Sequence, residues 1–369
     1  MKTPFDIGVT PDADGFLRCI RREGEPRRVH LFELYLDPEI QQAICDRYGV
    51  LEGLDPGGAH FELRRQIRLQ SFLGYDYVRC GLDGLQMPMS TRSVDDTAAM
   101  GRDAGRQFED EHTGPVATWE QFEKYDWPDP ARASTEPLEW LEKNLPDNMC
   151  VMGNSGYASS IGFGRFFKSL SSLMGYETMC YALYEQRDLV AAIVGRVTAI
   201  YKASLDRMLE FERVRLIVAN DDMGFKTGTL VSPGDLRELI LPAHKLMAQT
   251  ARAAGRPYVL HSCGNLALIM DDLIDDVRID AKHSFEDVIL PVAEAKRLYG
   301  GRIAILGGID MDAITRGSEA EVRARACQTL EACMPGGGYC LGTGNTVANY
   351  VPVDNYLAMM DEGRKFGRG

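Results

Sequence analysis

A histidine and a cysteine two residues apart, His261 and Cys263, end an apolar run in the segment LHSCGNL. Side chains alternate along an extended segment, so the imidazole and the thiol face the same side. Cys340 ends another short apolar run later in the chain. One imidazole and two thiolates are a typical catalytic zinc set, because three protein ligands leave a coordination position for substrate. Thiolates also favour zinc over magnesium or calcium.

A second interpretation of these three residues stays open: a core histidine with satisfied hydrogen bonds and two buried thiols that pack as small apolar side chains. The nine cysteines are an odd number scattered over 369 residues. This pattern is not that of a secreted disulfide framework. The N-terminal residues also lack the apolar segment of a secretory signal. We therefore expect a cytoplasmic protein with reduced thiols.

Three acidic residues also end or interrupt apolar runs. Asp221 and Asp222 lie in NDDMGFKTG, where paired acids can donate a proton or hold a substrate hydroxyl, and where the alternative is a capped turn. Glu33 lies in FELY, and an acid that points inward from an apolar strand needs a partner. Its alternative is an ion pair with a neighbouring arginine. We take these three acids as candidate catalytic residues.

Eight short apolar runs must position these side chains, and each is bounded by Gly, Pro, Asp or Asn. Amphipathic helical patterns lie between the later runs. Strands that alternate with helices predict parallel β/α units, and eight of them predict a (β/α)8 TIM barrel, with a doubly wound sheet as the competing fold. The predicted strands are 28–34, 76–80, 149–154, 216–221, 258–263, 277–283, 303–310 and 339–342, and the predicted helices are 189–211, 233–254, 266–276, 290–299, 318–333 and 353–366.

Catalytic and binding residues of such barrels lie at the carboxyl ends of the strands. Arg79, Asn154 and Asp310 occupy these positions, and we assign them to substrate binding. Residues 84–146 break the strand–helix rhythm, which predicts an insertion after the second strand within a single domain spanning 1–369. Long excursions there often cover an active site. Aromatic residues of the insertion, Tyr125 and Trp127, are candidates for an apolar lid, with ordinary surface packing as the alternative.

The composition narrows the classes of ligand. The net charge is -13, so nucleic acid and anionic membrane surfaces would be repelled. No apolar run approaches the roughly 18 residues of a membrane span. Hydrophobic residues make up 45% of the chain, as in an ordinary globular protein. A small-molecule substrate is therefore expected, and a homo-oligomer is compatible with the composition.

Several segments together resemble the uroporphyrinogen decarboxylase superfamily, whose fold is a TIM barrel. They are NDDMGFKTGTLVSPGDLRELILPAHKLM, LHSCGNL, ILGGID and the segment GTGNTVANYVPVDNYLAMM that follows Cys340. The resemblance covers nearly the whole chain. The metal-free decarboxylases of this superfamily carry an arginine-rich N-terminal motif of the MRQAGR type and an FSDI segment after the second strand. This chain has RRVHLFELYLD and YVRCGLDG in those places.

The second branch of the superfamily, the zinc-dependent methyltransferases linked to corrinoid proteins, is the better match. Its metal motif is H-x-C with a distant cysteine, which implies zinc ligation by His261, Cys263 and Cys340. Some members add a displaceable glutamate after the sixth strand, where Glu286 lies. None of the six histidines lies in the corrinoid-binding pattern D-x-H-x-x-G. The resemblance therefore implies that a separate corrinoid (cobalamin) protein is the partner.

Members of this branch act on methanol, methylamines, methyl halides, methyl ethers or coenzyme M. We favour O-demethylation of a methyl ether or methoxylated aromatic compound, in which zinc holds the leaving oxygen and Asp221 or Asp222 donates a proton. Three alternatives stay open. They are methylation of a thiol by methyl-cobalamin, metal-free decarboxylation, and a non-enzymatic barrel with a structural zinc site.

Overall fold

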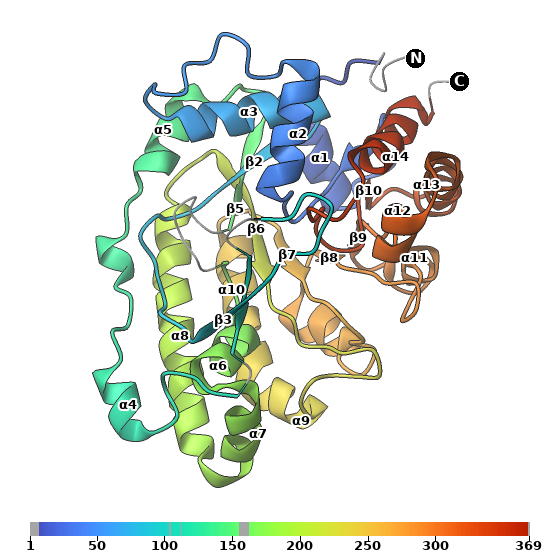
Figure 1. The fold of residues 1–369 in the computed structure, drawn as a ribbon. Coiled ribbons are helices and arrows are strands. Elements are labelled where there is room, and N and C mark those ends of the chain that lie inside the picture. Colours follow the sequence, from blue (N-terminus) through green and yellow to red (C-terminus); the bar gives the residue numbers. More distant parts are fainter. Residues whose placement is uncertain (1–6, 103–104, 111, 155–161, 368–369) are drawn as a thin grey trace.

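The centre of the molecule is a curved sheet of eight parallel strands (Figure 1). The computed structural model describes residues 7–102, 105–110, 112–154 and 162–367. The strand order β1-β10-β9-β8-β7-β6-β5-β2 follows the chain around the sheet, so the predicted (β/α)8 barrel is confirmed. Each predicted apolar run overlaps one of the strands, and only β6 begins before its predicted run. The strands are β1 His30–Leu31, β2 Tyr77–Cys80, β5 Cys150–Gly153, β6 Val214–Asn220, β7 Tyr258–His261, β8 Ala281–His283, β9 Ala304–Leu306 and β10 Tyr339–Leu341.

Helices follow the strands along the chain and cover the outside of the sheet (Figure 1). The predicted amphipathic helix 189–211 is α8, whose apolar face is buried. Ser232 caps the start of the predicted helix 233–254, because its hydroxyl accepts a hydrogen bond from Asp235 N. The helices that follow strands are α2 Pro38–Tyr48, α3 Phe61–Leu73, α6 Phe166–Met174, α7 Tyr176–Glu185, α8 Arg187–Met208, α9 Pro233–Asp235, α10 Leu241–Ala253, α11 Val292–Tyr299, α12 Met311–Arg316, α13 Glu319–Cys333 and α14 Val353–Lys365.

Two of the predicted helices are irregular. The segment 233–254 is interrupted by the π-helical turn η2 (Leu236–Ile240) just before Pro242. Proline lacks an N–H and its ring crowds the carbonyl one turn earlier, and a π turn accommodates both effects. The segment 266–276 forms mainly the π-helical turn η3 (Asp272–Val277). η2 follows β6, which leads into the acidic pair Asp221 and Asp222. η3 follows β7, which leads into the H-x-C pair His261 and Cys263.

Side chains hold the seam between the first and second strands. β1 and β2 stand at opposite ends of the strand order and share no backbone ladder within the described residues. The Tyr77 hydroxyl accepts from Glu33 N at 2.9 Å and donates to Glu33 O at 3.0 Å. Arg79 Nη1 donates to Leu34 O at 3.1 Å. Polar side chains of β2 thus take the place of strand pairing at this seam.

Helix α1 (Ala13–Ile20) lies against the amino ends of the strands. Ala13 N donates to Asn148 O at 3.0 Å, just before β5. The Cys19 thiol donates to Tyr339 O at 3.2 Å, at the start of β10. The helix therefore covers this end of the barrel, and the loops that follow the strands form the opposite end.

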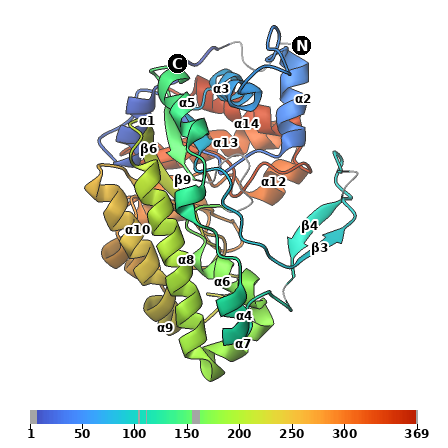
Figure 2. The same ribbon diagram turned by 90° about the vertical axis from the view of Figure 1, so that its left-hand side faces the viewer.

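Residues 84–146 link β2 to β5 and include a hairpin that projects from the side of the barrel (Figure 2). Their elements are β3 Thr91–Val94, β4 Arg106–Glu109, α4 Trp119–Lys124, the 3-10 turn η1 Pro130–Arg132 and α5 Glu136–Asn144. Tyr125 donates to Pro88 O at 2.7 Å, and the Arg196 guanidinium of α8 lies 6.0 Å from the Trp127 ring. Trp127 thus packs against α8 and Tyr125 packs against Trp127, with ring centroids 4.7 Å apart, which fits surface packing and not a lid.

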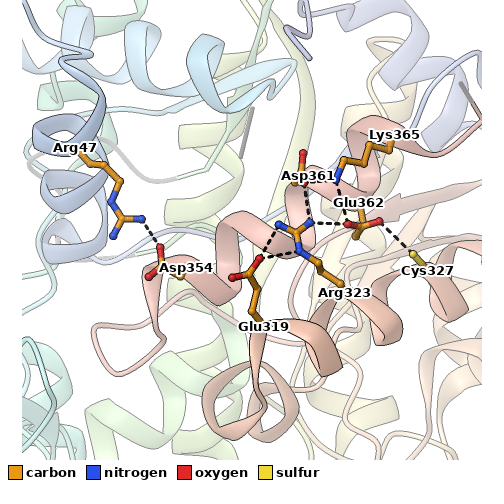
Figure 3. A network of polar contacts seen from close by, with 8 residues as sticks. All are labelled: Arg47, Glu319, Arg323, Cys327, Asp354, Asp361, Glu362 and Lys365. Atoms are coloured by element: carbon orange, nitrogen blue, oxygen red, sulfur yellow. Dashed lines mark hydrogen bonds and ion pairs between the residues drawn. The ribbon is translucent and has the colours of Figure 1, made fainter. Parts of the chain in front are cut away.

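Ion pairs join the last helices to each other and to an early one (Figure 3). Arg323 of α13 contacts Asp361 at 2.7 Å and Glu362 at 2.6 Å, both on α14. Arg47 of α2 pairs with Asp354 of α14. These contacts connect α13 and α14, at the C-terminal end of the chain, to α2, near its N-terminal end, where the ring of helices closes.

No helix in the described parts of the chain combines the length and the apolar character needed to cross a membrane. All nine cysteines are free thiols. The sulfur atoms of Cys19 and Cys340 lie 3.9 Å apart without a covalent bond.

Candidate active site

Three side chains that can bind a metal converge where β6 and β7 end. Their potential ligand atoms, from Asp222, His261 and Cys263, all lie within 4.8 Å of one another. His261 Nε2 is 3.5 Å from Cys263 Sγ and 3.6 Å from Asp222 Oδ1. β6 and β7 are parallel neighbours with Asn220 opposite His261. The loops that carry the acid and the thiol therefore start side by side.

Glycines bring these two loops into backbone contact. Gly264 has φ +82°, and a Cβ there would lie 2.1 Å from the Gly224 carbonyl carbon. Only glycine fits this close approach and this left-handed conformation. Asn265 N then donates to Phe225 O at 2.7 Å, and Cys263 N donates to Asp222 Oδ1 at 2.9 Å. The Gly-Asn step after the thiol thus locks the acid against the H-x-C segment.

The three groups interact strongly as charges. Burial opposes the charged form of His261, but the Cys263 thiolate and the Asp222 carboxylate outweigh it and raise the pKa of His261 to about 9. Burial would raise the pKa of Asp222, but its contacts with His261 and Cys263 N lower it well below its usual range. Without a metal, the cluster at neutral pH therefore contains an imidazolium beside the Asp222 carboxylate.

Hydrogen-bond donors surround the Cys263 sulfur. Asn345 Nδ2 lies 3.2 Å from it and Ser284 Oγ lies 3.6 Å from it. Behind them, the buried Lys282 ammonium donates to Ser262 O at 3.1 Å and Ser284 O at 2.8 Å. Burial lowers the pKa of Lys282 to about 8, although nearby negative charges oppose that shift. Donors and a cation of this kind stabilise a thiolate.

Asp221 and Asp222 have different environments. Asp221 is fully buried, and its carboxylate accepts from Phe167 N at 2.9 Å and Lys168 N at 2.8 Å, in the first turn of α6. His244 Nε2 contacts it at 3.0 Å. Asp221 therefore anchors a helix and does not reach a bound substrate. The Asp222 side chain is 45% exposed, and its lowered pKa makes it a ligand or base instead of a proton donor.

Glu33 is not part of the cluster. Its two carboxyl oxygens accept from Thr343 N and Thr343 Oγ1, both at 2.6 Å. Burial raises the pKa of Glu33 to about 8, although the hydrogen bonds from Thr343 oppose this. The residue joins the end of β1 to the loop after β10 as a neutral acid at pH 7. Its partner is a threonine, and not the arginine considered from the sequence.

Three other candidates lie outside the cluster. Cys340 is buried in mid-strand, where its thiol faces Cys19 of α1 at the amino end of the barrel. The expectation that it joins His261 is therefore not met. His261 lies at the carboxyl end of the barrel, which the chain reaches only after Cys340. Asp310 caps α12 and also accepts from Asp287 N at 2.9 Å. Glu286 lines a separate cavity of about 160 Å³ between the loops after β7 and β8.

Arg79 and Asn154, the other two candidates for substrate binding, do face the cluster. Both line a cavity of about 370 Å³ that also contacts the three potential metal ligands. A second cavity of about 310 Å³ shares Lys168 and Asp222 with the first, and it has more apolar walls. The first cavity is lined by Leu34, Tyr35, Arg79, Asn154, Gly162, Arg165, Lys168, Asn220, Asp222, His261, Cys263 and Asn345, and the second by Glu109, Asp110, Phe167, Lys168, Ser171, Ser172, Tyr176, Asp222, Phe225 and Leu230.

The cations of the first cavity differ in their partners. Arg165 and Lys168 both contact Glu109 of the insertion, at 2.8 and 2.7 Å. Arg79 has a carbonyl partner and lies over the Tyr35 ring at 5.3 Å, but none of the described carboxylates contacts it. The insertion thus reaches the site through Glu109 of β4, and Arg79 is available for an anion.

Sequence analysis missed several residues of this site. His283 directly pairs with His261 in the β7–β8 register, and its Nδ1 lies 2.7 Å from His261 Nδ1. Its position at the end of a predicted strand was a usable signal, since it matches that of His261. Asn345 and Ser284 lie in loops, where no periodic pattern marks the residues that turn toward the metal ligands.

Residues 80–366 match the family described as uroporphyrinogen decarboxylase (URO-D). Over 133 residues the chain is 29% identical to the methylated-thiol–coenzyme M methyltransferase of Methanosarcina mazei, covering 36% of this chain and 33% of that protein. Over 136 residues it is 30% identical to a uroporphyrinogen decarboxylase of Anaeromyxobacter dehalogenans, covering 36% of this chain and 37% of that protein. The matched segments thus span about a third of each relative.

The solved structure of a methyltransferase from Methanosarcina mazei is similar over the whole chain. It has a TM-score of 0.66 at 16% identity and covers 97% of this chain and 99% of its own. At this identity, the likeness concerns the fold alone.

Proposed function

The chain belongs to the uroporphyrinogen decarboxylase (URO-D) family, and from that premise we propose that it is a zinc-dependent methyltransferase. It moves a methyl group between a small substrate and a separate corrinoid protein. The single observation that carries this proposal is the cluster of Asp222, His261 and Cys263 on the wall of a cavity. The printed name of the Methanosarcina relative supports methyl transfer as the reaction class. The free thiols support a reducing, cytoplasmic setting.

The donor set of the cluster fits zinc. Tetrahedral zinc with bonds of ~2.0–2.3 Å to N, O and S places its ligand atoms about 3.3–3.6 Å apart. His261 Nε2 is 3.5 Å from the Cys263 sulfur and 3.6 Å from an Asp222 oxygen. One imidazole, one thiolate and one carboxylate would hold the ion and leave a position for substrate. Bound there, zinc supplies a Lewis acid that stabilises negative charge on the oxygen or sulfur of the substrate.

The residues around the cluster prepare it for this role. Asn345 and Ser284 direct hydrogen bonds at the Cys263 sulfur, which suits a sulfur that binds a metal as a thiolate. Arg79 would hold a negatively charged group of the substrate at the wall of the same cavity. Asn154, also on that wall, donates to Val218 O at 2.6 Å and is thereby fixed in orientation. The chain's own side chains therefore bind and orient the substrate beside the metal ligands.

Methyl ethers, and methoxylated aromatic compounds in particular, are the substrates that we favour. The adjoining cavity offers the rings of Phe167, Tyr176 and Phe225, and it meets the first cavity at Asp222. An aromatic ring in this second cavity would place its substituent oxygen beside the metal ligands. Apolar walls with a few convergent polar groups are typical of small-molecule sites.

Exposed apolar side chains support a protein partner at the same end of the barrel. Large apolar residues that are 41–71% exposed lie on the loops after β1, β6, β7, β8 and β10, namely Tyr35, Phe225, Leu268, Val288 and Tyr350. Such side chains favour protein contacts. A corrinoid protein that docks there would approach the cavity directly.

Metal analysis of matched variants tests the ligand set. The purified protein should contain about one zinc per chain, Cys263→Ala should lose it, and the control Cys340→Ala should keep it. Supplied with a reduced corrinoid protein and a methoxybenzene series, the zinc protein should release the corresponding phenols. A protein that binds no zinc even when zinc is supplied would refute the proposed metal site.

Two other reactions have observations in their favour. Arg79, without a carboxylate partner among the described residues, also suits the carboxylate of a decarboxylase substrate, and CO2 release without metal would identify that reaction. The Methanosarcina relative's name favours a thiol as methyl acceptor. Consumption of methyl-cobalamin in the presence of small thiols, with no phenol formed from ethers, would identify that direction.

A further inference from the structure

A chain of hydrogen bonds crosses the barrel behind the metal ligands. His261 Nδ1 lies 2.7 Å from His283 Nδ1, and His283 Nε2 lies 3.2 Å from Thr343 O. Thr343 in turn donates to both carboxyl oxygens of Glu33 at 2.6 Å. The chain therefore links the ends of β7, β8, β10 and β1.

The direction of each hydrogen bond follows from the groups involved. A carbonyl oxygen only accepts, so His283 Nε2 must carry the hydrogen that it donates to Thr343 O. A neutral imidazole has only one N–H, so His283 Nδ1 accepts. The hydrogen between the two rings then belongs to His261 Nδ1. This leaves His261 Nε2, the atom facing Cys263 and Asp222, as the nitrogen with a lone pair for a metal.

The surroundings of the His283 ring offer no carboxylate to balance a positive charge among the described residues. The side chain is fully buried, lies 5.1 Å from the Phe32 ring, and has no carboxylate in contact among the described residues. The groups that face it are His261, the carbonyl of Thr343 and, from the preceding position on its own strand, the cationic Lys282. Of these, only the Thr343 carbonyl favours an imidazolium, and burial, His261 and Lys282 together outweigh it.

The Thr343 carbonyl, which accepts the hydrogen bond from His283, is fixed in place. Gly307, with φ +73°, lies against both groups, and a Cβ there would come within 2.2 Å of Thr343 O and 2.8 Å of His283 Nε2. Glu33 holds the amide and hydroxyl of the same threonine. The Thr343 carbonyl therefore has little freedom to shift, and the hydrogen bond that it accepts orients His283.

We propose that His283 is a positioning residue that fixes the tautomer and ring orientation of His261. The inference deepens the proposed function and rests on its metal site. Partners that accept the second N–H of a metal-binding histidine typically change metal affinity 10- to 100-fold when they are removed. His283 touches neither substrate nor metal, so its effect is exerted through His261.

The test compares a replacement that removes the hydrogen-bond acceptor with one that keeps it. His283→Leu removes the acceptor, whereas the side-chain oxygen of His283→Asn can accept from His261 Nδ1 near the position of the original nitrogen. We expect His283→Leu to weaken zinc binding about 10- to 100-fold in competition with a chromophoric chelator. We expect His283→Asn to recover most of that loss. Equal losses in both variants would indicate packing alone and would overturn the proposal, as would wild-type affinity in both.

A second measurement uses the unaltered protein. With 15N-labelled histidine, NMR should detect a scalar coupling across the His261–His283 N–H···N hydrogen bond in the zinc-loaded protein. Absence of this coupling would refute the proposed hydrogen bond from His261 to His283, which we call the relay. If the wild-type protein binds no zinc, the proposed function fails. The metal-free protein still reports on the relay in that case, because His283 should carry its hydrogen on Nε2 and accept at Nδ1.

Discussion

Replacing Glu33 by glutamine should remove a pH dependence from the stability of the protein. Glu33 is buried, and its carboxyl oxygens accept from Thr343 at 2.6 Å. Burial raises its pKa from 4.5 to about 8, although those hydrogen bonds oppose the shift. The residue is therefore neutral in the folded protein at pH 7 and charged in the unfolded chain. Glutamine has nearly the same shape and stays neutral at every pH.

The sign follows from proton binding. Between pH 4.5 and about 8, the folded protein holds a proton on Glu33 that the unfolded chain has released. The free energy of unfolding must therefore fall as pH rises through this window, by at most about 1.4 kcal/mol per pH unit. Over the whole window the loss is at most about 5 kcal/mol. Below the window the contribution is fully present, and above it the contribution is lost.

Urea unfolding of the wild type and Glu33→Gln at pH values from about 5 to about 8 measures this difference directly. The variant should gain stability relative to the wild type as pH rises. Glu286→Gln is the matched control, because it makes the same substitution at a half-exposed glutamate away from β1. A constant difference between the wild type and Glu33→Gln across the pH range would refute the assignment of Glu33 as a buried neutral acid.

Three further results are expected. Zinc affinity should fall about tenfold per pH unit as the pH drops below about 9, which is the pKa of His261 in the metal-free protein. The reason is that the metal displaces one proton from that ring. A pH-independent affinity in chelator competition would contradict this. Arg323→Ala should lower the free energy of unfolding by about 1–2 kcal/mol, because it leaves the largely buried Asp361 without its guanidinium, and thermal unfolding measures the loss. Arg79→Met should raise KM about 10- to 100-fold for a carboxylated substrate, leave its neutral analogue unaffected, and preserve zinc content.

The fold was accessible from the sequence because strand and helix patterns are local. Each of the eight apolar runs is short and ends at a breaker, and the long amphipathic helix shows its period over many residues. The pairing of His261 with Cys263 was also local, since alternation along a strand places them on one face. The adjacent acids Asp221 and Asp222 could not be separated in this way. The structure turns one into a helix anchor and the other toward the metal ligands.

Cys340 shows the limit of sequence spacing. The apolar run ends near Cys340. Because the strands of a barrel are staggered, the end of a run in the sequence does not tell how far along the barrel axis that residue lies. The structure places Cys340 beside α1 and brings the later Thr343 and Asn345 to the site. Glu286 likewise follows the correct strand but faces a separate cavity.

The sequence by itself determined the architecture and one half of the site, the H-x-C pair, because these depend on periodicity and on contacts between near neighbours. Only the tertiary structure decided the third residue of the proposed metal site, the histidine behind His261 and the cations that line the cavity. Asp222, His283 and Arg79 come from three different strand ends. Their meeting depends on the register and curvature of the whole sheet, which no local pattern encodes.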